Sequence, residues 1–152
     1  MIASELVKAG ANPHEVAKNI YDTNSFERLR LTGYVLSEKL KILPEYRTVY
    51  ITLSKQELNK FGSQTGDTEG LVNYGLSIKG IVLSVFIYDR GDDVKLSLRS
   101  LGNFSVNEMA RQHFEGGGHK NASGGQSNLS LEKTLEKFLS ILPGYKDQLL
   151  KN

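Results

Sequence analysis

Glycine surrounds a single histidine in the segment FEGGGHKNASGG, residues 114–125. Glycines at this density let the backbone approach a ligand closely, and successive backbone N–H groups in such a segment can converge on an anion. Arg99, His119 and Lys120 could supply the positive charge that an anion requires, and arginine suits bidentate phosphate binding best. One interpretation of the segment is therefore a phosphate-binding loop.

Two structural interpretations remain open beside it. A glycine that follows a helix is a common C-cap, which explains Gly116 but leaves Gly117, Gly118, Gly124 and Gly125 without a reason. A flexible linker is unexpected between a helix and a strand of one domain. Against the phosphate loop, the end of a helix carries the negative pole of its dipole, and no lysine–serine or lysine–threonine pair follows as in a P-loop. Composition alone favours neither a ligand loop nor a turn.

A metal site is the other chemistry to weigh. His113, Glu115 and His119 are ligand types within seven residues, but the glycines between them would orient them poorly. The aspartates of the DRGDD segment, residues 89–93, are typical of a solvated turn. No serine–histidine–aspartate arrangement is identifiable. We therefore expect neither a metal ligand nor a catalytic residue in this chain.

The strands that would position these residues are indicated by alternation. Residues 47–53 alternate apolar and polar side chains, as in a half-buried strand, and residues 81–88 are apolar on both faces, as in a central strand. The segment VKLSLRS, residues 94–100, returns with Val94, Leu96 and Leu98 toward the core. Lys95, Ser97 and Arg99 then share the opposite face. A further short strand is possible after the glycines, near residues 122–129.

Helices are indicated between these strands. Ser54 with Glu57, and Ser105 with Glu108, have the spacing of capping boxes, and Asn12 precedes a proline as an N-cap would. The apolar residues at 131–142 repeat with helical spacing. Together the pattern predicts an α/β (α+β) fold, a mixed β-sheet flanked by helices.

The first 43 residues read as helices without a strand. An apolar stripe is expected along one longer helix that ends at Pro44; it comprises Leu29, Gly33, Leu36, Leu40 and Leu43. We therefore expect a helical linker over residues 1–45 and a separate domain over residues 46–152. Met1 leads directly into sequence that reads like the middle of a protein, so we expect a fragment of a longer chain.

Composition limits the function classes. The 152 residues carry 19 basic and 17 acidic side chains, a net charge of +2, which is too balanced for non-specific binding to duplex DNA. Any nucleic-acid ligand should be small or bound locally. There is no cysteine, so disulfides and thiolate zinc sites are excluded. Without a signal peptide or a membrane-spanning run, the expected location is the cytoplasm.

The GGGH motif with Ala122 and Gly124, preceded by SLR at residues 97–99, resembles the C-terminal, substrate-binding domain of the DHH phosphoesterases. GDTEGLVNYGLSIKGI, residues 66–81, is similar to the stretch before this motif in the nanoRNase and phosphoadenosine phosphatase branch of that RecJ-like family. The resemblance covers about residues 46–142. The first residues are similar to that family's interdomain linker.

The resemblance implies a function. The glycine-rich segment would close on a substrate phosphate or terminal nucleotide, and two manganese ions in a separate N-terminal domain, absent here, would perform the hydrolysis. The chain alone is then expected to be inactive. Its expected partners are short RNA oligonucleotides or nucleoside bisphosphates and its own catalytic domain. The implied substrate-binding residues are Ser97, Arg99, Gly116, Gly117, Gly118, His119, Lys120 and Asn121.

Two alternatives belong to other classes. One is a stand-alone RNA-binding module without catalysis, and the other is a structural domain whose glycines only form a turn. The weak positive charge disfavours long RNA. The choice among nanoRNA, phosphoadenosine phosphate and a linear dinucleotide stays open, as does the oligomeric state.

Overall fold

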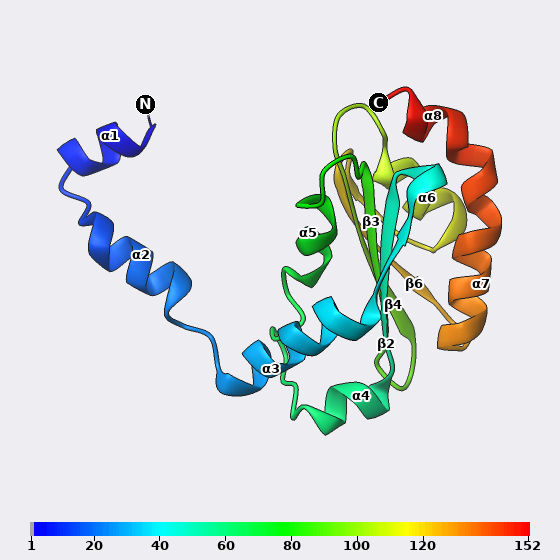
Figure 1. Ribbon diagram of the computed structural model, residues 1–152, viewed down its shortest axis with the longest axis horizontal. Coiled ribbons are helices and arrows are strands. Elements are labelled where there is room, and N and C mark those ends of the chain that lie inside the picture. Colours follow the sequence, from blue (N-terminus) through cyan, green and yellow to red (C-terminus); the bar gives the residue numbers. More distant parts are fainter. Residues whose placement is uncertain (1) are drawn as a thin grey trace.

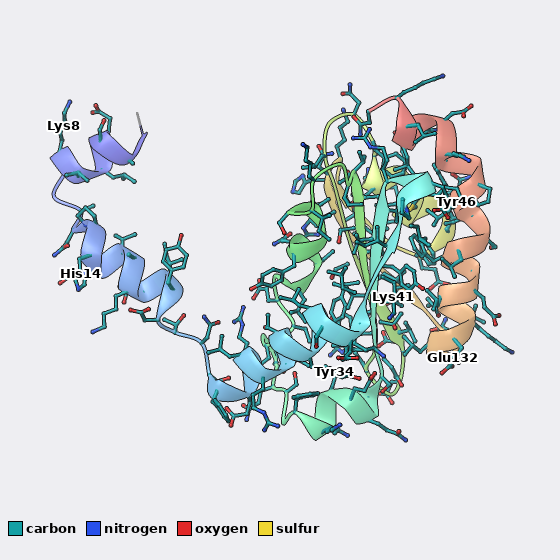
Figure 2. All side chains as sticks on the ribbon, viewed as in Figure 1. Lys8, His14, Tyr34, Lys41, Tyr46 and Glu132 are labelled. Atoms are coloured by element: carbon teal, nitrogen blue, oxygen red, sulfur yellow. The ribbon has the colours of Figure 1, made fainter. Side chains whose placement is uncertain are left out.

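A computed structural model describes residues 2–152 and begins with an extended helical arm. α1 (Ile2–Lys8) and α2 (Pro13–Tyr21) lie apart from the rest of the molecule, and α3 (Phe26–Tyr34) joins them to it (Figure 1). The labelled side chains of Lys8 and His14 project from this arm, away from the sheet (Figure 2). Among residues 2–152 no helix is long and apolar enough to cross a membrane.

The remaining chain is built on a mixed β-sheet, which confirms the predicted fold class. Its strand order is β1-β2-β3-β4-β6-β5. Only β2 and β3 run parallel among these neighbours; the other pairs are antiparallel. The strands are β1 (Leu40–Leu43), β2 (Thr48–Leu53), β3 (Leu83–Asp89), β4 (Val94–Ser100), β5 (Gly117–His119) and β6 (Ala122–Ser127).

Helices cover the two faces of the sheet unequally. On one face α6 (Val106–His113), α7 (Leu131–Ile141), the 3-10 turn η3 (Leu142–Tyr145) and α8 (Lys146–Leu150) pack over a core that includes Leu96 and Leu98. On the other face α5 (Leu71–Leu76) packs on β2, β3 and β4, and α3 adds Leu31 to a second core cluster. Figure 1 shows α5 and α7 on opposite sides of the strands. On the face under α5, β6 and β5 lie beyond the main contacts of α5, which are with β2, β3 and β4.

The expectation of strand-free helices up to residue 43 is wrong. α3 ends at Tyr34, a π-helix (η1) occupies Val35–Lys39, and β1 then pairs antiparallel with β2; a short 3-10 turn (η2, Pro44–Tyr46) leads into β2. The predicted stripe is also wrong, because Leu29 and Leu36 are 56% and 41% exposed. The buried contacts come from Leu31 and Val35 instead. The periodicity misled because an irregular helix end was read as a continuous helix.

The first capping box confirms the start of α4 (Lys55–Lys60). Ser54 Oγ accepts a hydrogen bond from the Glu57 N–H, and a Glu57 carboxylate oxygen accepts one from the Ser54 N–H. The other Glu57 oxygen accepts hydrogen bonds from Tyr34 and from Lys39, whose Nζ lies 2.8 Å away. Figure 2 shows Tyr34 where α3 meets the domain, near α4. This cluster fastens the root of the arm to the sheet domain.

Candidate phosphate-binding site

Strand register brings Arg99 and His119, two of the three residues predicted to supply positive charge, into one row across the sheet. Arg99 on β4 pairs with Ala122 on β6, and Ala122 pairs with His119 on β5. Residues directly opposite each other in antiparallel strands project from the same face. With neighbouring strands about 4.8 Å apart, the Cα atoms of Arg99 and His119 are about 10 Å apart across Ala122. Arg99 and His119 therefore lie on the same face of the sheet, on either side of the Ala122 methyl group.

This face lies opposite the core formed with α6 and α7. Its neighbours on β4, Leu96 and Leu98, are buried toward those helices, whereas Arg99 is half-buried and His119 is exposed. Arg99 Nη1 donates to the carbonyl oxygens of Leu98 at 3.0 Å and Ser123 at 3.5 Å. Within residues 2–152 no carboxylate lies within ion-pair distance of Arg99, and the His119 ring has no hydrogen-bond partner. The positive charge of Arg99 is thus available to an anion.

A second row of small residues lies beside the first. Ser97 on β4 pairs with Gly124, and Gly124 pairs with Gly117. A Cβ added at Gly124 would meet only the Leu96 carbonyl oxygen, at 3.6 Å, so packing does not require glycine there. The absence of a side chain leaves exposed backbone next to Ser97 and Arg99. Such a bare patch lets a ligand approach the sheet closely.

The glycines form a β-hairpin, which corrects the expectation of a loop whose N–H groups converge on an anion. The Gly116 N–H donates to the Ala110 carbonyl at 3.2 Å, and the Gly118 N–H donates to Asn107 Oδ1 at 2.9 Å. These two donors are already used within the protein. Such a glycine-rich segment can still form paired strands, because β5 and β6 have mostly small residues where the two strands face each other.

Close packing explains several of these glycines. A Cβ at Gly125 would lie 2.8 Å from Phe114 Cβ, and one at Gly116 would collide with the Gly124 carbonyl oxygen. Gly118 has a φ of +151°, which side chains rarely adopt. The structural interpretation therefore accounts for Gly116, Gly118 and Gly125, and it leaves Gly117 and Gly124 without a packing requirement for glycine.

Lys120 and Asn121 form the hairpin turn, which is fastened to the loop after β4. Asn121 Nδ2 donates to Ser100 Oγ at 2.9 Å and to the carbonyl oxygens of Gly102 and Phe104, both at 3.2 Å. Lys120 Nζ donates to Asn103 Oδ1 at 3.1 Å. These contacts give Asn121 a structural role in holding the hairpin, and a ligand contact for either residue stays a prediction.

His113 lies away from this face and is not beside His119. Its Nε2 lies 2.9 Å from the hydroxyl of Tyr145, and burial, together with the charge of Lys137, lowers the pKa of the imidazole. In the part of the chain from residue 2 to 152, no three histidine, aspartate or glutamate side chains gather as a metal site would require. The candidate site therefore consists of Arg99, His119 and the small residues between and beside them.

The contribution of Ala122 to the site was not predicted from the sequence, because the reasoning considered charged side chains. Ala122 was noted as part of a motif, but its place between Arg99 and His119 depends on pairing across three strands. The residues HKNA carry the signal, since two turn residues between His119 and Ala122 place them opposite each other in a hairpin.

Residues 46–145, about two thirds of the chain, match the family model of the DHHA1 domain. The chain belongs to the DHHA1 domain family. The chain that contains this DHHA1 domain is 30% identical over 122 residues to the bifunctional oligoribonuclease and PAP phosphatase NrnA of Bacillus subtilis, covering 80% of this chain and 37% of that protein. It is 30% identical over 143 residues to NrnA of Thermus thermophilus, covering 93% of this chain and 41% of that protein.

Among solved structures, the DHHA1 domain is similar to an exopolyphosphatase-related protein from Bacteroides fragilis. The TM-score is 0.92 at 42% sequence identity, and the match covers 97% of this chain and 43% of that one. The chain therefore spans about two fifths of the length of the proteins it matches. The similarity confirms the predicted resemblance to the C-terminal part of the DHH phosphoesterases.

Proposed function

We propose that this DHHA1 domain holds the terminal phosphate of a short oligonucleotide or nucleoside bisphosphate for a metal-dependent phosphodiesterase. The observation that carries the proposal is the row in which Arg99 and His119 flank Ala122 on the face of the sheet opposite α6 and α7. Arginine offers paired N–H donors that match two phosphate oxygens, and such charge-assisted bonds are among the stronger ones. The relatives named as acting on oligoribonucleotides and PAP have in common substrates that carry a phosphate on a nucleoside.

Each side chain has a separate task in this proposal. Arg99 neutralises the phosphate, His119 donates one further hydrogen bond, and Ser97 with the bare backbone at Gly124 lets the ligand approach the strands. Two metal ions, which we expect to be manganese held by a catalytic domain outside this sequence, would activate water for attack on the phosphodiester. The contribution of this domain is positioning, because a phosphate fixed at one end places the scissile bond at a set distance.

An NMR titration of the 152-residue chain tests the proposal. The ligands are the 5′-phosphorylated dinucleotide pApA, phosphoadenosine phosphate and the unphosphorylated dinucleotide ApA. We expect amide shifts at Arg99, His119 and Gly124 with both phosphorylated ligands and much weaker ones with ApA. Amides of α7, on the opposite face, provide the internal control. Equal shifts with ApA, or shifts confined to α7, would refute the assignment.

A further inference from the structure

A second candidate binding site lies at the carboxyl ends of the parallel strands. A cavity of about 300 Å³ is bounded there by α4, by the loop between α4 and α5, and by the end of β3. Open α/β sheets commonly bind ligands beyond the carboxyl ends of parallel strands. Small-molecule sites start near this volume. The cavity is therefore suited to a group as small as a nucleobase with its ribose.

Unused hydrogen-bonding groups line this cavity. The side chains of Asn59, Gln64 and Thr65 have no hydrogen-bond partner among residues 2–152, although all three border the space. An amide side chain offers a donor and an acceptor together, which matches the edge of a base. The unpaired bases of single-stranded RNA are recognised by hydrogen bonds of this kind.

The charges at the cavity are mixed. Lys55 and Arg90 line it and have no ion-pair partner within residues 2–152, while Asp89 lines it and accepts a hydrogen bond from the Gly91 N–H at 2.6 Å. A carboxylate at the rim disfavours a second phosphate inside. Two cations nevertheless favour a ligand that brings a backbone phosphate to the rim. This combination fits a nucleoside within a chain better than a free anion.

Tyr88 links the cavity to the Arg99–His119 row. Its ring stacks on Phe86 with centroids 4.7 Å apart, and the half-buried side chain also lines the cavity. Tyr88 pairs with Lys95, and Lys95 pairs with Gln126, so this third row lies on the same face as Arg99. Lys95 is four residues from Arg99 on β4, or about 13 Å along the strand. Aromatic side chains commonly stack on the bases of single-stranded RNA.

We propose that this cavity is a second nucleoside subsite. It takes the base and ribose of the next nucleotide, while Arg99 and His119 hold the terminal phosphate, and the ligand chain runs over Ser97 and Lys95. The inference rests on the proposed function for the position of the first phosphate. Within the proposed substrates it favours short oligonucleotides over nucleoside bisphosphates, because a ligand needs at least two nucleotides to reach the cavity.

Affinities of the 152-residue chain for AMP and pApA, measured by calorimetry, test this subsite. The informative variant is the double substitution Asn59→Ala and Gln64→Ala, since both side chains are exposed and neither supports the core. Gln56→Ala, exposed on the same helix but outside the cavity, is the matched control. We expect wild type to bind pApA roughly tenfold more tightly than AMP, as two added hydrogen bonds would give.

The double variant should bind pApA no more tightly than AMP while its affinity for AMP stays unchanged. Gln56→Ala should keep the preference for pApA. In wild type the side-chain NH2 signals of Asn59 and Gln64 should shift with pApA but not with AMP. If pApA binds no more tightly than AMP, or the double variant weakens both equally, the subsite is refuted and the phosphate site stands. If neither ligand binds wild type, the proposed function fails, and the subsite fails with it.

Discussion

Arg99 and His119 stand on either side of Ala122 in a single row across β4, β6 and β5. Arg99 comes from the strand before α6 and His119 from the hairpin after it, so the fold brings together residues twenty positions apart. The face that carries them lies opposite the α6–α7 core. A phosphate over Ala122 would lie within reach of both side chains.

The glycines of the hairpin should separate into two classes. Gly125→Ala should destabilise the fold, because its Cβ would lie 2.8 Å from Phe114 Cβ and 2.9 Å from the Phe114 carbonyl oxygen. Overpacking of this kind costs about 1–3 kcal/mol. Gly124→Ala should leave stability unchanged or slightly higher, because there is room for the added Cβ. It should weaken pApA binding, because the added methyl group would stand where the ligand approaches the strands. Thermal unfolding together with calorimetric titration checks both variants, and a loss of stability at Gly124 alone would contradict this division.

Much of this arrangement was predictable from the sequence, and the rest was not for physical reasons. Alternation in VKLSLRS placed Ser97 and Arg99 opposite the core, because period-two patterning reports faces directly. The hairpin was missed because glycine has no side chain to show alternation, so paired strands look like a loop. β1 was missed because Leu40 and Leu43 have helical spacing. Their strand conformation depends on pairing with β2, which the local sequence does not show.

His119 should contribute less to binding than Arg99. His119→Ala removes one hydrogen-bond donor, which is worth about 0.5–1.5 kcal/mol when neutral, whereas Arg99 makes charge-assisted contacts. Calorimetry with pApA at neutral pH should therefore rank His119→Ala between wild type and Arg99→Ala. Because His119 is exposed and its ring is unpartnered, melting temperature should not change. A larger loss of affinity for His119→Ala than for Arg99→Ala would contradict the assignment of Arg99 as the main phosphate ligand.

The Glu57 cluster should make the free energy of unfolding depend on pH in the acid range. Burial raises the pKa of Glu57, but hydrogen bonds from Lys39, the Ser54 N–H, Tyr34 and the Ser54 hydroxyl outweigh it and lower the pKa from 4.5 to about 2. The folded protein thus keeps the carboxylate charged where the unfolded chain would bind a proton. The stabilisation is complete above pH 4.5 and is lost as pH falls toward 2.

Urea unfolding across this pH window measures the effect. Wild type should lose at most about 3 kcal/mol more than Glu57→Gln on acidification, because the pKa is lowered from 4.5 to about 2 and each unit corresponds to about 1.4 kcal/mol. Glu136→Gln, exposed on α7 and outside the Glu57 cluster, should lose stability in acid as wild type does. Parallel acid curves for wild type and Glu57→Gln would show that the cluster does not hold its charge.

The 152-residue chain should not hydrolyse pApA when supplied with manganese. Residues 2–152 bring no three histidine, aspartate or glutamate side chains together, so they offer no place for the expected metal pair. Highly purified protein incubated with pApA and analysed by chromatography checks this expectation. Turnover that a chelator abolishes would show that catalysis resides in this DHHA1 domain itself.

The most direct test of the central claim is a four-way comparison of affinities. Wild type and Arg99→Ala are each titrated with pApA and with ApA, which differ in the terminal phosphate alone; Arg30→Ala, on α3, is the control for loss of one surface charge. If Arg99 binds that phosphate, its removal should cost pApA about 1.5–3 kcal/mol, roughly ten- to hundredfold in affinity, and leave ApA nearly unchanged. An equal loss for both ligands, or a loss for neither, would contradict the assignment of Arg99 to the phosphate.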